Sequence, residues 1–141
     1  LPPRSPMRQN NLVGAGPAKQ GDHVTATDYH LIQPPGPSSP VLVPHAFAGI
    51  LNSNLSTDVN VESKPAAFLG SIAANQPPHI PSGGTFIIPP QNKGDVVSGS
   101  ATVFINSKPA ARSGDTVMTC NDPAPLPVGT IQATSTVLIG G

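Results

Sequence analysis

Five side chains in this sequence offer the ligand chemistry that zinc prefers. The chain has four histidines, His23, His30, His45 and His79, and a single cysteine, Cys120. Structural zinc sites take four tetrahedral ligands, drawn mainly from imidazole and thiolate groups. Five candidates therefore compete for four positions. Their separation along the chain is too wide for any short zinc-finger pattern, so only the fold could bring them together.

The same residues also allow three other interpretations. The histidines could lie in solvent, and a lone cysteine is often a small core residue. Cys120 with a histidine could also form a nucleophilic pair, which is the enzyme alternative. However, four protein ligands close a zinc site to substrate. Only seven acidic residues are present to orient a base, and a small repeat body leaves little room for a cleft. We therefore expect a structural metal and no enzyme activity.

An internal repeat organises the elements that must position these side chains. Residues 100–115 read SATVFINSKPAARSGD, and a diverged copy, TDVNVESKPAAFLG, occupies residues 57–70, about 44 residues upstream. A third copy is split between the two ends, as PAKQGD at residues 17–22 and STVLIGG at residues 135–141. Joined head to tail, these halves complete one more unit. The repeat predicts a closed, pseudo-threefold body in which the two ends of the chain are neighbours.

Each Pro-Ala-Ala segment is interpreted as a corner that turns the chain. Proline fixes φ and donates no ladder hydrogen bond, the alanines allow close packing near an axis, and the following glycine allows positive φ. Prolines interrupt almost every window long enough for a helix, so an all-β fold of short strands is expected, with at most a short turn of helix. We predict strands near Val24–Tyr29, Ser39–Val43, Asp58–Glu62, Thr85–Ile88, Asp95–Val97, Thr102–Asn106, Thr130–Ala133 and Thr136–Ile139.

Composition limits what can hold such a body together. The chain has 14 glycines and 19 prolines but only 4% aromatic residues, so hydrophobic burial is scarce. A single cysteine excludes an internal disulfide, and a metal is the natural replacement. Seven basic and seven acidic residues are scattered singly, which argues against nucleic-acid binding. No apolar run predicts a transmembrane segment or a signal peptide.

The segment Lys108-Pro-Ala-Ala-Arg-Ser-Gly-Asp115 resembles the PAAR-repeat family, and the resemblance extends over residues 17–141. It implies a single domain there, a small pseudo-threefold cone with zinc near its apex. Residues 1–16 are expected to form a flexible lead, with the residues before Met7 as a candidate cloning remnant. The chain departs from the motif at Phe68-Leu69-Gly70-Ser71 and at Lys19-Gln20. These departures put in doubt any role of the motif's Arg and Asp beyond local turn hydrogen bonds.

The resemblance also narrows the ligand choice. Thr27-Asp-Tyr-His30 is similar to the family's Asp-x-His segment, whereas His23 directly follows the corner residue Asp22 at a variable position. Proline precedes both His45 and His79, at positions that look like family ligands, and Cys120 lies in the loop after the third corner. The predicted zinc ligands are therefore His30, His45, His79 and Cys120, with His23 left out.

For function, the resemblance implies a tip that caps and sharpens the trimeric β-helical spike (VgrG-like) of a contractile injection machine such as a type VI secretion system. Such a tip aids membrane puncture, makes transient contact with the target membrane, and can carry an effector or adaptor. It would be assembled in the bacterial cytoplasm and then injected with the spike. The alternative is a zinc-stapled adaptor that recruits effectors without a puncturing role.

Overall fold

The computed structural model describes residues 15–140, which form an elongated body of β-strands and turns. The described residues contain no helix, in agreement with the all-β prediction, and therefore none that is long and apolar enough to cross a membrane. The strands are β1 (His23–Gln33), β2 (Val41–Ser53), β3 (Asn60–Val61), β4 (Lys64–Pro65), β5 (Ile72–Asn75), β6 (Thr85–Phe86), β7 (Lys93–Val96), β8 (Phe104–Ile105), β9 (Lys108–Pro109), β10 (Thr116–Thr119) and β11 (Leu126–Gln132).

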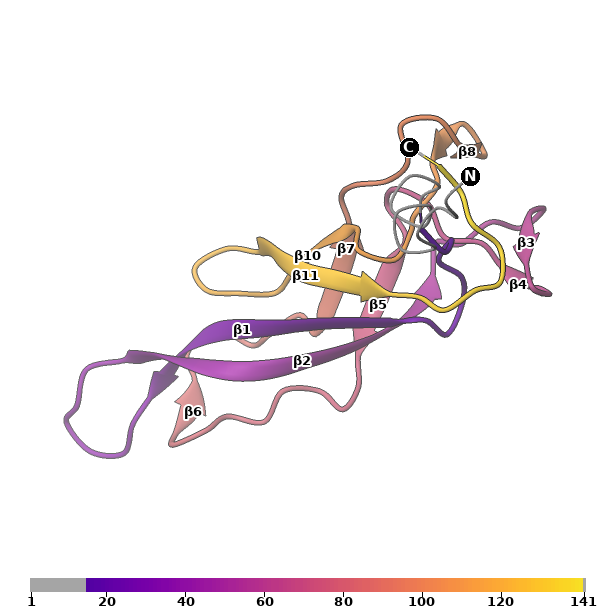
Figure 1. Ribbon diagram of the computed structural model, residues 1–141. Coiled ribbons are helices and arrows are strands. Elements are labelled where there is room, and N and C mark those ends of the chain that lie inside the picture. Colours follow the sequence, from indigo (N-terminus) through magenta and orange to yellow (C-terminus); the bar gives the residue numbers. More distant parts are fainter. Residues whose placement is uncertain (1–14, 141) are drawn as a thin grey trace, which may run out of the picture.

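Six of these strands close into a barrel-like cone. The main sheet has the order β11-β10-β7-β5-β2-β1-β6, and β11 also pairs with β1. This extra pairing closes the ring, so neither β1 nor β11 is left as an open edge along the paired stretch. The turn between β1 and β2 lies at one end of the molecule, and the small hairpins β3–β4 and β8–β9 lie at the other (Figure 1). We call these the narrow end and the wide end.

Three equivalent corners meet on the pseudo-threefold axis. Ala18, Ala67 and Ala111 are fully buried there, and their backbones form a cyclic set of hydrogen bonds. The amide of Ala18 donates to Ala111, that of Ala67 to Ala18, and that of Ala111 to Ala67, at 2.8, 2.9 and 3.1 Å. Only a small side chain allows three backbones to approach one axis this closely. This ring gives the alanines of the repeat a structural explanation.

A second cyclic set of hydrogen bonds lies beside the first. It joins Gln20 to Pro65, Leu69 to Pro109 and Ser113 to Gly16, at 2.9, 2.9 and 2.8 Å. The following glycine has φ of +91°, +98° and +92° in the three corners, at Gly21, Gly70 and Gly114. The predicted corners are therefore confirmed, including the one assembled from the amino-terminal segment.

The third repeat is completed by both ends of the chain. The amide of Ala15 donates to the carbonyl of Ile139 at 3.1 Å, and the amide of Ile139 donates back to Ala15 at 2.9 Å. The prediction that the ends of the body are neighbours is confirmed for these two residues. Of the predicted lead, residues 1–14 lie outside the described residues, while Ala15 and Gly16 already belong to the folded body.

The largest difference from the predicted strands is the length of β1 and β2. They form one long hairpin in which Asp28 faces His45 and His30 faces Val43 in the register. Pro44 does not interrupt β2, because it faces Tyr29, whose amide points away from β2 and donates to Asn121 Oδ1 at 2.7 Å. A proline at such a non-hydrogen-bonded position removes no ladder bond. The sequence-based prediction was therefore wrong to end this strand at Val43.

The core is divided into two small clusters. The larger one lines the cone, with Phe47, Leu51 and Ile131 as its bulkiest members around the corner alanines. The second lies at the wide end, where Phe68 and Ile105 pack with Ala66 and Ala110. Neither cluster reaches the turn of the β1–β2 hairpin. The narrow end must therefore be held together by something other than aliphatic packing.

Candidate metal centre

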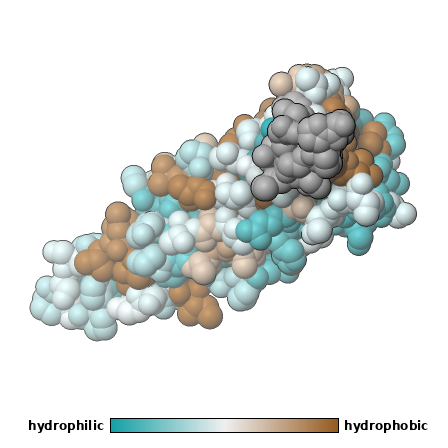
Figure 2. Space-filling model, viewed as in Figure 1, coloured by the Kyte–Doolittle hydropathy of each residue, from teal (hydrophilic) through white to brown (hydrophobic). Residues whose placement is uncertain are grey.

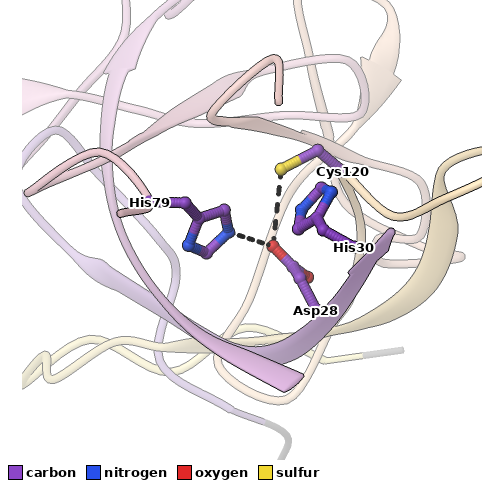
Figure 3. Close-up of side chains that lie close together, drawn as sticks. All are labelled: Asp28, His30, His79 and Cys120. Atoms are coloured by element: carbon purple, nitrogen blue, oxygen red, sulfur yellow. Dashed lines mark hydrogen bonds and ion pairs between the residues drawn. The ribbon is translucent and has the colours of Figure 1, made fainter. Parts of the chain in front are cut away.

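Four side chains in the narrow half bring their metal-binding atoms together. Asp28 and His30 come from β1, His79 from the segment after β5, and Cys120 from the turn after β10. The candidate ligand atoms of these four residues all lie within 4.8 Å of one another, and all four residues are buried or nearly so. Figure 3 shows the four side chains pointing toward one another from separate strands and loops. The separation of 92 residues between Asp28 and Cys120 is bridged by the closed sheet.

His45 lies beside this group on β2. Its ring centroid is 5.7 Å from that of His30 and 5.5 Å from that of His79. Its Nδ1 lies 2.8 Å from the carbonyl of Val43, which fixes the proton on Nδ1 and leaves Nε2 with a free lone pair. The structure thus gathers all four predicted ligands in one region, while His23 lies exposed at the start of β1.

Three histidine ring nitrogens of the site lack hydrogen-bond partners in the part of the chain that the structure describes. Nε2 of His45 and both ring nitrogens of His30 are buried without any hydrogen-bond partner among the described residues. Nδ1 of His30 lies 3.4 Å from Asp122 Oδ2, but without hydrogen-bond geometry. Leaving buried polar atoms unpaired costs about 1–3 kcal/mol each. A metal ion would satisfy the lone pair of His45 and the one lone pair of the neutral His30 ring, so the donor set fits a metal such as zinc.

Burial controls the protonation of two of these groups. Burial lowers the pKa of His30, although the nearby Asp122 carboxylate acts to raise it, so the ring is neutral and carries a lone pair. For Cys120, burial first and then the Asp28 carboxylate raise the pKa to about 11. The metal-free protein therefore holds a thiol rather than a thiolate. A metal ion that binds here displaces that proton, because only the thiolate is a good ligand.

Phe86 and the prolines around the site limit its contact with water. The ring of Phe86, on β6, lies 5.8 Å from His30 and 5.5 Å from His45, measured between centroids. A cavity of about 120 Å³ reaches His30 and Cys120 from the outside, between segments 88–91 and 121–125. The turn of the β1–β2 hairpin, residues 34–40, lies at the end of the molecule (Figure 1), and β1 continues past His30 to Gln33 before that turn begins. The site thus lies near the apex rather than at its outermost point.

Asp28 is the residue of the site that the sequence analysis did not single out as a ligand or partner. It was quoted only as part of the segment that ends in His30. Residues two apart on a strand share a face, so a longer β1 would have placed Asp28 beside His30. The register also places it opposite His45. Asp28 was missed because the predicted strand, Val24–Tyr29, ended before His30, whereas β1 continues to Gln33.

The chain was compared with protein-family models. The model described as the PAAR motif matches residues 34–117 and 88–141, which together cover residues 34–141 of the 141-residue chain. The matched region contains the second and third corners as well as His45, His79 and Cys120. A comparison with curated proteins found no match to this chain.

Proposed function

Because the chain belongs to the PAAR-motif family, which is structural and is associated with the spike tips of contractile injection systems, we propose that it forms the pointed tip of such a spike, as in a type VI secretion system. The observation that carries this proposal is the pseudo-threefold ring of corners. A single chain with an approximate threefold axis can sit on the end of a partner with a true threefold axis. A trimeric β-helix ends in unpaired strand edges that need such a cap.

The wide end offers the surface for this partner. The three repeats contribute Val59-Asn60-Val61, Val103-Phe104-Ile105 and Val137-Leu138-Ile139 at equivalent positions. In each triplet the third residue packs in or against the wide-end cluster. The apolar side chains left outside are Val59, Phe104, Val137 and Leu138, which are 37%, 56%, 46% and 49% exposed. Burying them against the spike would contribute about 25 cal/mol per Å² of apolar area removed from water.

The narrow end has the surface expected of a point that passes through lipid. No Asp, Glu, Lys or Arg occurs in residues 29–57 or 65–92, which include most of the β1–β2 hairpin and the segment that carries His79. Val41, Leu42 and Ile80 are about half exposed or more there. Figure 2 shows apolar patches along this half of the surface. Moving charged groups into a bilayer is costly, so an uncharged end lowers the resistance to puncture.

The metal is proposed to be zinc, held by His30, His45, His79 and Cys120. Bound zinc would supply four fixed ligand bonds in a region where Cys120 is the only proposed ligand that belongs to a core cluster, and structural zinc can contribute on the order of 10 kcal/mol. The chain's own part is to exclude water with Phe86 and to hold neutral His30 in place. We propose that the protein has no catalytic activity, is assembled in the cytoplasm and leaves the cell with the spike, with an effector or adaptor as a further partner.

Co-elution with a spike tests this function. The protein would be mixed with the trimeric β-helical spike proteins encoded in the same genome and analysed by size-exclusion chromatography with light scattering. We expect a complex of one tip per trimer, lost or strongly weakened in the Phe104→Asp and Leu138→Asp variants. Ile80→Asp, at a narrow-end position that is 75% exposed, should bind like the wild type. Equal binding by all variants, or no binding by the wild type, would contradict the proposal.

A further inference from the structure

The Asp28 carboxylate is the point where three separate arms of the metal centre meet. It is fully buried, on β1, and accepts hydrogen bonds from groups of the two other arms. Its Oδ2 lies 2.8 Å from His79 Nε2 and 3.4 Å from Cys120 Sγ. These two contacts are drawn in Figure 3. A buried carboxylate needs such partners, because an unpaired charge in the interior is very costly.

The other oxygen of Asp28 contacts the turn that carries Cys120. Thr119 Oγ1 donates to Asp28 Oδ1 at 2.5 Å, and Asn121 Nδ2 donates to the same oxygen at 3.3 Å. Asn121 in turn accepts from the amide of Tyr29 on β1 at 2.7 Å. The residues on both sides of Cys120 are thus tied to β1, and Asp28 is the centre of this network. The direction of the thiol depends on these bonds.

Five donors surround a site that takes four ligands, so either Asp28 or His45 is not a zinc ligand. Both Asp28 oxygens already have partners, whereas Nε2 of His45 is buried with none. We infer that Asp28 is a positioning residue: it accepts hydrogen bonds from Thr119 and Asn121 and so orients the turn that carries Cys120, so that the thiol sulfur meets the ring nitrogens of His30 and His45. This inference rests on the metal site proposed above and adds a role that the ligand set alone does not contain.

Asp28→Asn tests the inference, because it keeps the shape and removes the charge. Removing a carboxylate that orients metal ligands typically lowers metal affinity 10–100-fold. Affinity for Zn²⁺ would be measured by competition with a chromophoric chelator, and the ligand set by the visible spectrum of the Co²⁺-loaded protein. We expect Asp28→Asn to lose affinity by that factor with the tetrahedral Co²⁺ spectrum preserved. His45→Ala should change the spectrum.

Thr119→Val gives a milder second variant in case Asp28→Asn folds poorly. It removes only the hydroxyl that donates to Asp28 Oδ1, so a smaller loss of affinity is expected. Combined with Asp28→Asn its effect should not be additive, because Thr119 and Asp28 are in direct contact. Asp115→Asn is the matched control: this buried carboxylate accepts from the Arg112 amide at 2.7 Å in the third corner, away from the metal centre. It should lower stability and leave the affinity for Zn²⁺ unchanged.

Each result bears on a different claim. If the wild type binds neither Zn²⁺ nor Co²⁺, the metal site itself is wrong. If the wild type binds and Asp28→Asn and Thr119→Val bind equally well, only the positioning role of Asp28 is overturned. A Co²⁺ spectrum that changes in Asp28→Asn but not in His45→Ala would make Asp28 the fourth ligand and would also overturn the inference.

Discussion

At the scale of single residues, the unsatisfied ring nitrogens are what distinguish a metal centre from a buried polar cluster. Nε2 of His45 and both ring nitrogens of His30 are buried without partners within residues 15–140, and each costs stability while it stays unsatisfied. An ion could take the lone pair of His45 and the one lone pair of the neutral His30 ring, whose other nitrogen carries a proton. Hydrogen bonds within the cluster satisfy Asp28 but not these imidazoles. The residues that lack partners are therefore histidines, which are good zinc ligands.

Replacing individual histidines should separate ligands from bystanders. His45→Ala removes a proposed ligand, so bound zinc should fall well below one equivalent. His23→Ala should leave zinc content unchanged, since His23 is exposed at the other end of β1. Elemental analysis after dialysis against a weak chelator measures both. Loss of zinc in the His23 variant with retention in the His45 variant would invalidate the ligand assignment.

The thiol gives a prediction about pH. In the metal-free protein the pKa of Cys120 is raised from 9.0 to about 11. The folded state therefore keeps its proton in a range where the unfolded state loses it, and the metal-free protein should lose stability as pH rises from about 9 to 11. The zinc-loaded protein should lack this thiol-dependent loss, because its sulfur is already a thiolate. Urea unfolding at several pH values checks this, with Cys120→Ser as the control; a metal-free protein with the same pH profile as Cys120→Ser would contradict it.

At the scale of elements, the corner is the unit that the sequence predicted best. Its Pro-Ala-Ala and Gly residues have strict backbone requirements that are visible without a structure. The departures from the motif are also explained. Phe68 occupies the place of Lys19 and Arg112, and it packs in the wide-end cluster while Ser71 Oγ accepts from its amide at 2.9 Å. The same bond is made by Asp22 and Asp115 in the other corners, at 2.9 and 2.7 Å.

The corner glycines provide a test of the repeat. Alanine at Gly21 or Gly114 would meet no atom within 4 Å, so its cost comes from the positive φ alone. Left-handed backbone at a residue with a side chain costs about 1–2 kcal/mol. Each of Gly21→Ala and Gly114→Ala should lower the free energy of unfolding by this amount. Gly140→Ala, where the backbone is ordinary and a Cβ would make only an ordinary contact with Thr102 Oγ1 at 3.9 Å, should change it by less than about 0.5 kcal/mol. Unequal corner penalties would argue against equivalent turns.

The strands were predicted less well than the corners, because the ends of strands were inferred from neighbouring residues alone. Pro44 suggested that a strand ends there. However, Pro44 lies at a position of β2 where a backbone amide would make no hydrogen bond to β1. Which amides face the partner strand depends on the register, which follows from the closed sheet rather than from neighbouring residues. The same long hairpin places Asp28 and His45 opposite each other, so the missed strand length and the missed role of Asp28 have one cause.

At the scale of the whole molecule, charge and packing are distributed along the long axis. The corners and the wide end contain the two corner ion pairs, Lys19–Asp22 and Arg112–Asp115, and the second core cluster. The hairpin at the narrow end has no formal charge on residues 29–57. In the proposed function, the wide end binds the spike and the narrow end enters the membrane. The charge-free segment can be read from the sequence, but only the fold shows that it lies at one end of the molecule.

Removing the metal should therefore increase local unfolding at the narrow end and not at the wide end. Without zinc, amides of β1 and β2 near His30 and His45 should exchange with solvent faster, since few aliphatic contacts hold them. Amides of the wide-end hairpins, such as Ala66 and Ala110, which donate to Val59 and Val103 at 3.0 Å, should keep their protection. Hydrogen exchange followed by mass spectrometry, with and without a strong chelator, resolves the two regions. Uniform loosening of both ends would contradict a local role for the metal.

The central claim is that a metal ion joins separate arms of a chain too poor in apolar side chains to support a point by packing. Native mass spectrometry of the purified protein, combined with elemental analysis, tests this most directly. We predict one zinc ion per folded chain in the wild type and none in Cys120→Ser, which should also unfold at a lower temperature. A wild type that is fully folded and free of metal, with the same melting temperature as Cys120→Ser, would contradict the account.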